Sequence, residues 1–372
     1  MRLCVEKNKK QKTKNTKQLQ AAGVYGKNQF AYTTGRDARD AIALLVLRWI
    51  HGWSLKLIWA IYCSDVSGAF DKVSTDILMD KLRRLNIHPK ILAVLESWLQ
   101  ARKAKVIVDG ESSFEFWLRE MVYQGTVWGP PLWNIHFSDA RQAIRASGFK
   151  EVVFADDLNA YKSFPANTPE ETLRAEMQSC QAELHQWGSG NQVQFDAAKE
   201  SMHILAPFSR GSNDEFKLLG LIFDSSLTMQ SELHHLVGNV RWKNQTILRC
   251  QRFFGIYDLI NVYKSQVLSY IEYRTPGVYH ACSTHLDRLD GTQTRFLEAL
   301  GLSEKDALQS FGLAPLRLRR DIAMLGVIHR SVLGKGPPQF HELFQRADAS
   351  APTRATRQSA QRHNKQLVDV RD

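Results

Sequence analysis

The chain lacks the features that mark several large protein classes. Its five cysteines show no CxxC spacing, so neither a zinc site nor a disulfide framework is expected, and a reducing compartment is favoured. The lysine-rich start has no apolar segment after it, which argues against a signal peptide. The most apolar early stretch, residues 41–63, is interrupted by Arg48, His51 and Lys56 and is a poor membrane span. We therefore expect an intracellular protein with no membrane partner.

Acidic residues are fewer than basic residues. The chain has 49 Lys and Arg residues against 38 Asp and Glu residues, a formal net charge of +11. This excess favours a polyanionic partner, with nucleic acid ahead of a membrane surface. At 372 residues and 44% apolar content, the chain is long enough for two or three folded units. We expect residues 1–27 to form a flexible basic arm and residues 346–372 a disordered tail.

Two apolar runs end in carboxylates. Residues 152–160 read VVFADDLNA, which predicts a buried strand that delivers Asp156 and Asp157, and residues 57–65 read LIWAIYCSD and end in Asp65. Two carboxylates about 4 Å apart repel by roughly 4 kcal/mol at an effective dielectric of 20. A divalent metal ion relieves that repulsion and suits phosphoryl transfer between nucleotides. An ordinary turn is the competing interpretation, and the spacing alone does not separate the two.

The order of predicted elements indicates the fold. A strand is followed by helices, a strand-turn-strand, a helix from a Thr168 N-cap to about Trp187, and strand candidates at 192–195, 202–205 and 216–223. This is the split βαβ-βαβ arrangement of the α+β class, an antiparallel sheet with helices on one face, in which the first strand lies beside the central hairpin. We also expect one helix over 132–147, a hairpin around Asp109-Gly110 with a loop longer than two residues, and a helical region after about residue 228.

Three segments in order resemble a known family. Residues 65–71 (DVSGAFD), 124–134 (QGTVWGPPLWN) and 154–157 (FADD) resemble motifs A, B and C of reverse transcriptases, most closely those of non-LTR (LINE-type) retrotransposons. Further similarities are motif D at Trp187, Asn191, Phe195 and Lys199, motif E at 217–224 (KLLGLIFD), and the segment before motif A at 29–42. The resemblance implies the RNA-directed DNA polymerase core of a retrotransposon, with partial fingers at 28–56, a polymerase palm at 57–225, and a helical thumb and C-terminal region at 226–345.

The resemblance also implies chemistry for single residues. Asp65, Asp156 and Asp157 would hold two Mg²⁺ ions, with Mn²⁺ as an alternative, and Asp156 would be a stronger ligand than Asp157. Lys199 would approach the leaving pyrophosphate as a proton donor. The implied partners are an RNA template, a DNA primer and a deoxynucleoside triphosphate (dNTP), and the implied locations in a eukaryotic host are the nucleus and cytoplasm.

Two further groups of residues follow from the same motifs. Phe70 would exclude a ribose 2′-OH and so select deoxynucleotides. The full nucleotide-binding set is Val66, Phe70, Gln124 and Gly125, and the implied primer grip is Leu218, Leu219 and Gly220.

The chain also departs from the family pattern. Trp128 replaces a usual Leu, no fuller fingers region precedes Gln29, and no endonuclease or ribonuclease H segment is evident. We therefore expect a fragment of an element. One alternative is a catalytically inactive nucleic-acid-binding remnant. Another is a different palm polymerase, such as an intron maturase or an RNA-dependent RNA polymerase, although the latter would not favour Phe70.

Overall fold

The computed structural model describes residues 23–85, 87–100, 102–118, 121–207 and 214–344. The chain divides into two compact units, Met1–Arg36 with Trp59–Ile204 and Asp37–Ile58 with Leu205–Asp372. The predicted tail and residues 1–22 of the predicted arm lie outside the described residues. The division cuts the chain at other points than the predicted fingers, palm and thumb boundaries, which stay predictions.

A four-stranded sheet forms the centre of the first unit. Its strand order is β6-β7-β1-β8, so the first strand of the chain lies beside the central hairpin. This order, with helices between the strands, confirms the predicted α+β palm fold. The strands are β1 (Leu57–Ser64), β6 (Lys150–Phe154), β7 (Asp157–Pro165) and β8 (Ser201–Leu205).

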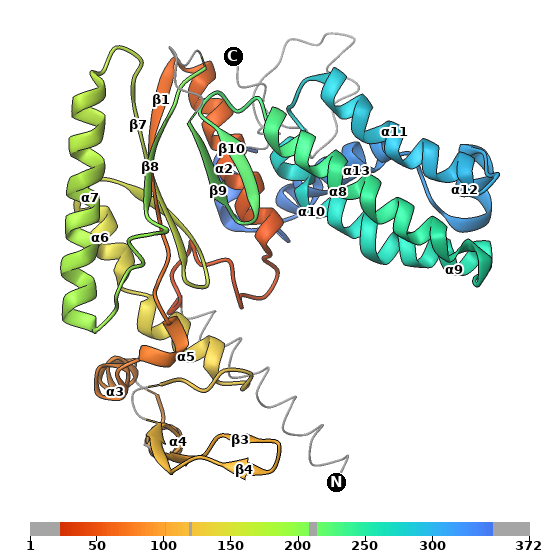
Figure 1. The fold of residues 1–372 in the computed structure, drawn as a ribbon. Coiled ribbons are helices and arrows are strands. Elements are labelled where there is room, and N and C mark those ends of the chain that lie inside the picture. The colour runs from red at the N-terminus through yellow and green to blue at the C-terminus, as the bar shows by residue number, and fades with distance from the viewer. Residues whose placement is uncertain (1–22, 86, 101, 119–120, 208–213, 345–372) are drawn as a thin grey trace. The chain divides into compact units, whose positions relative to one another are not determined.

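Two helices cover one face of this sheet, as Figure 1 shows for α6 (Ala140–Ala146) and α7 (Glu170–Asn191). Leu173, Met177 and Leu184 of α7 are fully buried, at the spacing of one helical face. Lys162 of β7 donates to Glu176 of α7 over 2.7 Å, which ties sheet and helix at their polar edge. The remaining helical segments of the unit are η1 (Ala69–Lys72), α3 (Thr75–Arg84), α4 (Pro89–Leu99) and α5 (Gly129–Phe137).

The helix predicted over 132–147 is in fact two helices, α5 and α6. The chain breaks at Ser138 and Asp139, where no glycine or proline marks a stop. Tertiary contacts hold the break, because the Asp139 carboxylate accepts hydrogen bonds from Lys81 Nζ (2.7 Å) and Trp187 Nε1 (3.1 Å). The prediction of one helix was wrong because these partners are distant in sequence.

Two other local predictions need correction. The loop at Asp109-Gly110 has two residues, since Val108 pairs with Glu111, and both loop residues have positive φ, as in a type I′ turn. Helix α7 begins after an N-cap at Pro169 and extends past Trp187 to Asn191. The hairpin around Asp109-Gly110 has two paired regions. At its tip β3 (Ile107–Val108) pairs with β4 (Glu111–Ser112), and at its base β2 (Arg102–Ala104) pairs with β5 (Phe116–Leu118).

The second unit is mostly helical. Helix α2 (Ala38–Ser54) packs on α10 (Ser269–Val278), and Trp49 of α2 lies edge-on to Phe223 with ring centroids 5.7 Å apart. Phe223 belongs to a two-stranded sheet of β9 (Glu215–Leu218) and β10 (Leu221–Asp224). The other elements are α8 (Gln230–Arg249), η2 (Cys250–Arg252), α9 (Ile256–Tyr263), η3 (Lys264–Leu268), α11 (Ser283–Ala299), α12 (Glu304–Phe311), α13 (Leu316–Val332) and η4 (Pro338–Glu342). Within the described residues, no helix is both long and apolar enough to cross a bilayer.

Gly188 of α7 provides a direct test of the packing in the first unit. A Cβ at this position would lie 2.7 Å from the Val193 carbonyl oxygen and 2.9 Å from the Phe195 ring. We expect Gly188→Ala to lower the free energy of unfolding by roughly 1–3 kcal/mol, because the backbone of the following loop must shift. Urea unfolding of the purified protein measures this change.

Gly190, two residues further along the same helix, is the matched control. Nothing lies within 4 Å of a Cβ built there. Gly190→Ala should therefore raise the free energy of unfolding by about 0.5–1 kcal/mol, the usual gain for alanine over glycine in a helix. Equal effects of the two substitutions would contradict the close approach at Gly188.

Candidate active site

Three carboxylates gather at one end of the sheet in the first unit. Asp65 directly follows β1, whose neighbour in the sheet is β7. Phe154 pairs with Asp157 across the β6–β7 hairpin, so its turn consists of Ala155 and Asp156. The hairpin thus delivers Asp156 in the turn and Asp157 as the first residue of β7, both within electrostatic reach of Asp65.

The protein environment disfavours charge on both hairpin carboxylates. Burial, followed by the nearby charges of Asp65 and Asp156, raises the pKa of Asp157 to about 6, against a smaller opposing effect of Lys199. Burial and the charge of Asp65 raise the pKa of Asp156 as well, while a backbone hydrogen bond and Lys199 oppose the shift. Because burial and like charge both disfavour the ionised carboxylates, a nearby positive group would stabilise their charged forms.

Lys199 supplies one positive charge. Its Nζ lies 2.5 Å from Asp65 Oδ2 and 3.8 Å from Asp196 Oδ2. The hydrogen bond and charge of Asp65 raise the pKa of Lys199, which keeps the ammonium protonated. A cation that binds Asp65 through this oxygen must therefore compete with Lys199.

Backbone hydrogen bonds hold residues 192–200, the Lys199 loop between α7 and β8, against the end of β1. The Asp196 N–H donates to the Asp65 carbonyl over 3.0 Å, and the Ser67 N–H donates to the Gln194 carbonyl over 2.8 Å. Instead of the predicted strand at 192–195, the structure forms one isolated bridge there, between Val66 and Phe195. This bridge brings the predicted motif D residues Phe195 and Lys199 to motif A.

Glu200 anchors the same loop, and the sequence interpretation missed it. Its buried carboxylate accepts from Tyr62 of β1 and from Gln181 of α7 (3.2 Å), and it bonds the His185 ring (2.8 Å). The sequence shows only that a glutamate follows the candidate lysine. Its partners lie 15 to 138 residues away, so the sequence does not reveal the buried contacts of Glu200. Glu200 thus fixes the backbone from which Lys199 projects.

Gln124 and Gly125 lie in an exposed turn before α5. Gln124 Nε2 donates to both carboxylate oxygens of Asp71 at 3.1 Å. Gly125 has a φ of +72°, and nothing lies within 4 Å of a Cβ built on it. Positive φ favours glycine at this position, and the open space leaves its backbone accessible to another molecule.

Phe70 and Val66 lie on either side of Ser67 and Gly68. Phe70, in η1, stacks on Trp133 of α5 with ring centroids 5.7 Å apart. Gly129 lies next to the Phe70 ring, because a Cβ built on this glycine would be 3.5 Å from a carbon of that ring. Val66 is buried, and its backbone bridges Phe195. Phe70, predicted to exclude a ribose 2′-OH, is thereby held against α5, which lies within the motif B segment 124–134.

The predicted primer grip belongs to the second unit. Leu218 ends β9 and is buried, while Leu219 and Gly220 have positive φ and form the turn to β10. Tyr273 of α10 donates its hydroxyl to the Leu219 carbonyl over 2.7 Å. The turn is therefore held in one conformation by α10 of the same unit.

The donor set fits a hard divalent cation, because carboxylate oxygens are the ligands that Mg²⁺ prefers. Among the described residues, however, no group of three or more His, Cys, Asp or Glu side chains has the arrangement of a ready metal site.

Comparison with known proteins identifies the family. The reverse transcriptase (RNA-dependent DNA polymerase) family matches residues 1–223. The chain belongs to the reverse transcriptase family. Reverse transcriptases use divalent metal ions for nucleotidyl transfer.

The chain also resembles curated proteins of mobile elements. It is 25% identical over 253 residues to the RNA-directed DNA polymerase from mobile element jockey of Drosophila funebris, an alignment that covers 63% of this chain and 28% of the relative. It is 28% identical over 142 residues to the probable RNA-directed DNA polymerase from transposon BS of Drosophila melanogaster, covering 35% and 15%. These relatives confirm the resemblance to non-LTR elements. The chain spans 28% of the length of the jockey relatives it matches.

Among solved structures, the chain is similar to two telomerase structures. Telomerase from Candida tropicalis, in complex with a TWJ fragment of telomeric RNA, matches with a TM-score of 0.44 and 10% identity over 85% of this chain and 56% of that one. The corresponding complex from Candida albicans matches with a TM-score of 0.41 and 13% identity over 86% and 55%.

The raised pKa of Asp157 predicts a pH-dependent cost to stability. A folded-state pKa of about 6, above the ordinary value of 3.8, means that the contribution of Asp157 to stability is most favourable below about pH 4 and is lost as the pH rises through 6. Asp157→Asn should therefore raise the melting temperature of the metal-free protein at pH 7.5, by roughly 2–4 °C for each 1 kcal/mol of relieved repulsion. Differential scanning calorimetry at pH 5 and 7.5 measures the effect.

Asp109→Asn removes a carboxylate from an exposed turn and serves as the matched control. It should leave the difference between the two pH values unchanged. A melting temperature that Asp157→Asn lowers at both pH values would contradict a carboxylate held against repulsion.

Proposed function

We propose that this chain is the RNA-directed DNA polymerase core of a non-LTR retrotransposon. The supporting observation is the cluster of Asp65, Asp156 and Asp157 at the end of two adjacent strands, with Lys199 on Asp65. Half-buried carboxylates at the ends of neighbouring strands, with raised pKa values at Asp156 and Asp157, are the groups that a nucleotidyl transferase needs to hold metal ions. The proposed locations are the nucleus and cytoplasm of a eukaryotic host.

The proposed reaction is attack of a primer 3′-OH on the α-phosphate of a dNTP, with release of pyrophosphate. Asp65 and Asp156 would hold two Mg²⁺ ions, with Asp157 as an auxiliary ligand. Bound metal ions supply activation of the hydroxyl and neutralisation of the pyrophosphate. Lys199 Nζ would leave Asp65 and donate its proton to the departing pyrophosphate, which is why a protonated, exposed lysine beside Asp65 suits the step.

The surrounding residues would select and orient the substrates. Phe70, stacked on Trp133, would block a ribose 2′-OH and so favour deoxynucleotides. Gln124, oriented by Asp71, and Gly125 would contact the template and the incoming nucleotide. Leu218, Leu219 and Gly220 would support the primer end.

A basic groove in the second unit supports binding of a nucleic-acid duplex. A cavity of about 680 Å³ lies along α8 and α11 and contains no acidic residue among its lining side chains. Its basic lining residues are Arg241, Arg288, Arg295, His234, His235 and His285. Arginine contacts with phosphates release counterions, which makes the affinity depend on salt.

The proposed activity is tested by extension of a DNA primer on an RNA template with dNTPs and Mg²⁺. We expect extension by the wild-type protein and none above background by Asp156→Asn, because the substitution keeps the size of the side chain and removes its charge. Denaturing gel electrophoresis of a labelled primer measures both. Asp109→Asn, in an exposed turn, should extend the primer at the wild-type rate.

A folded wild-type protein that extends no primer would overturn the polymerase proposal. If it still bound template and primer, the alternative of a catalytically inactive nucleic-acid-binding remnant would take its place. Incorporation of ribonucleotides as readily as deoxynucleotides would contradict the role of Phe70 and favour another palm polymerase.

The basic groove predicts how the affinity for nucleic acid depends on salt concentration. Arg288→Ala combined with Arg295→Ala should weaken binding of an RNA–DNA hybrid and lower the slope of log affinity against log salt concentration by about 1–2, since each lost phosphate contact removes roughly 0.7–0.9. Fluorescence anisotropy at several salt concentrations measures the slope. Arg317→Ala, at an exposed position of α13 outside the groove, should change neither quantity.

A further inference from the structure

The turn that carries the candidate catalytic carboxylates has a strained backbone. Ala155 is the first of its two residues and has a φ of +61°, whereas Asp156 has no positive φ. This is the φ pattern of a type II′ turn, in which glycine is the favoured first residue. A non-glycine residue in this conformation needs support from its surroundings.

One buried side chain supports both backbone groups of Ala155. The Ala155 N–H donates to Gln29 Oε1 over 3.1 Å, and Gln29 Nε2 donates to the Ala155 carbonyl over 3.3 Å. Gln29 is only 5% exposed, and Ala155 is buried as well, so water does not readily replace these bonds. The Trp133 indole of α5 donates to the same carbonyl over 3.0 Å.

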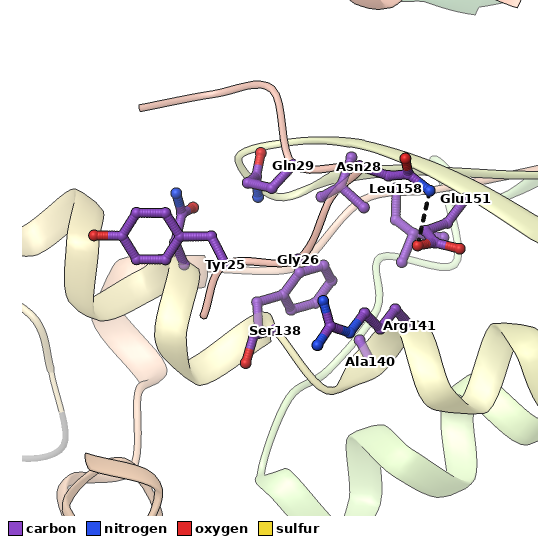
Figure 2. A pocket seen from close by; sticks show the side chains of 12 residues that line it. Tyr25, Gly26, Asn28, Gln29, Ser138, Ala140, Arg141, Glu151 and Leu158 are labelled. Atoms are coloured by element: carbon purple, nitrogen blue, oxygen red, sulfur yellow. Dashed lines mark hydrogen bonds between the residues drawn. The ribbon is translucent and has the colours of Figure 1, made fainter. Parts of the chain in front are cut away.

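The segment around Gln29 is itself fixed to β6. The Val153 N–H donates to the Asn28 carbonyl (3.0 Å) and the Phe30 N–H donates to the Val153 carbonyl (2.9 Å), which makes a parallel bridge between Gln29 and Val153. The Ala31 N–H donates to Gln29 Oε1 over 3.0 Å and fixes the orientation of the side-chain amide. Figure 2 shows Gln29 beside the hairpin, and a dashed line marks the Asn28–Glu151 hydrogen bond further along β6.

The pocket next to this segment does not explain the arrangement as a ligand site. Its volume of about 20 Å³ has room for a water molecule but for no nucleotide. The buried amide of Gln29 instead forms its bonds with the turn. We propose that Gln29 is a positioning residue that holds the Ala155–Asp156 turn in its strained conformation and thereby orients Asp156 and Asp157 for cation binding.

This inference rests on the proposed function, because it assumes that the two carboxylates bind metal ions. The amide of Gln29 accepts from the Ala155 N–H and donates to the Ala155 carbonyl at once. Methionine has a similar size and removes both bonds. Glutamate keeps an acceptor for the N–H but sets a carboxylate oxygen against the carbonyl.

The test compares Gln29→Met with wild type in two measurements. Equilibrium Mn²⁺ binding, followed by electron paramagnetic resonance of the free ion without substrates, should weaken about ten- to a hundredfold. The kcat of primer extension should fall by a similar factor, while KM for the template–primer changes less than about twofold, since displacement of a reacting group by about 1 Å can cost a hundredfold. Gln29→Glu, which keeps the size and one hydrogen bond, should weaken Mn²⁺ binding as well.

Two further variants separate positioning from general stability. Asn28→Ala removes the bond to Glu151 from the same segment and should lower the melting temperature without changing Mn²⁺ affinity. Ala155→Gly should restore part of the Mn²⁺ affinity and kcat in the Gln29→Met protein, because glycine adopts positive φ without a supporting bond.

Unchanged Mn²⁺ affinity in both folded Gln29 variants would overturn the inference, as would equal losses in Gln29→Met and Asn28→Ala. If Gln29→Met does not fold, Gln29→Glu and its combination with Ala155→Gly provide the same comparison. A wild-type protein that binds Mn²⁺ at Asp156 but extends no primer would contradict the proposed function and leave the positioning role standing.

Discussion

The mutual repulsion of three carboxylates is the constraint on which the first unit depends. Asp65, Asp156 and Asp157 approach closely enough for burial and like charge to raise the pKa of Asp157 to about 6. Such an arrangement lowers stability at neutral pH unless a cation neutralises it, and Lys199 does so in part by bonding Asp65. A site that is costly to the folded protein and favourable to a bound cation is the expected state of a metal-dependent enzyme.

The neighbouring structure works against that repulsion. The bridge between Val66 and Phe195 and the buried Glu200 fix the Lys199 loop at the end of β1. At the β6–β7 turn, Gln29 accepts from the Ala155 N–H, and the Trp133 indole donates to the Ala155 carbonyl. The charges are therefore held by hydrogen bonds to backbone and buried side chains from four separate segments.

The sequence predicted those features that repeat locally or belong to a motif. Apolar runs that end in Asp65 and Asp156 indicated the strands, and the order of elements indicated their adjacency, because sheet topology follows simple rules. The structural roles of Gln29 and Glu200 were not predicted, since their partners lie as far as 126 and 138 residues away, respectively. The break at Ser138 and Asp139 was missed for the same reason, because Lys81 and Trp187 hold it.

The central claim is that Asp65 and Asp156 bind the same cations. Anomalous diffraction from crystals soaked in Mn²⁺ tests it most directly. The account predicts an anomalous peak within coordination distance of carboxylate oxygens from Asp65 and Asp156, with Lys199 Nζ displaced from Asp65. A structure in which Mn²⁺ binds elsewhere while the Lys199–Asp65 ion pair stays intact would contradict it.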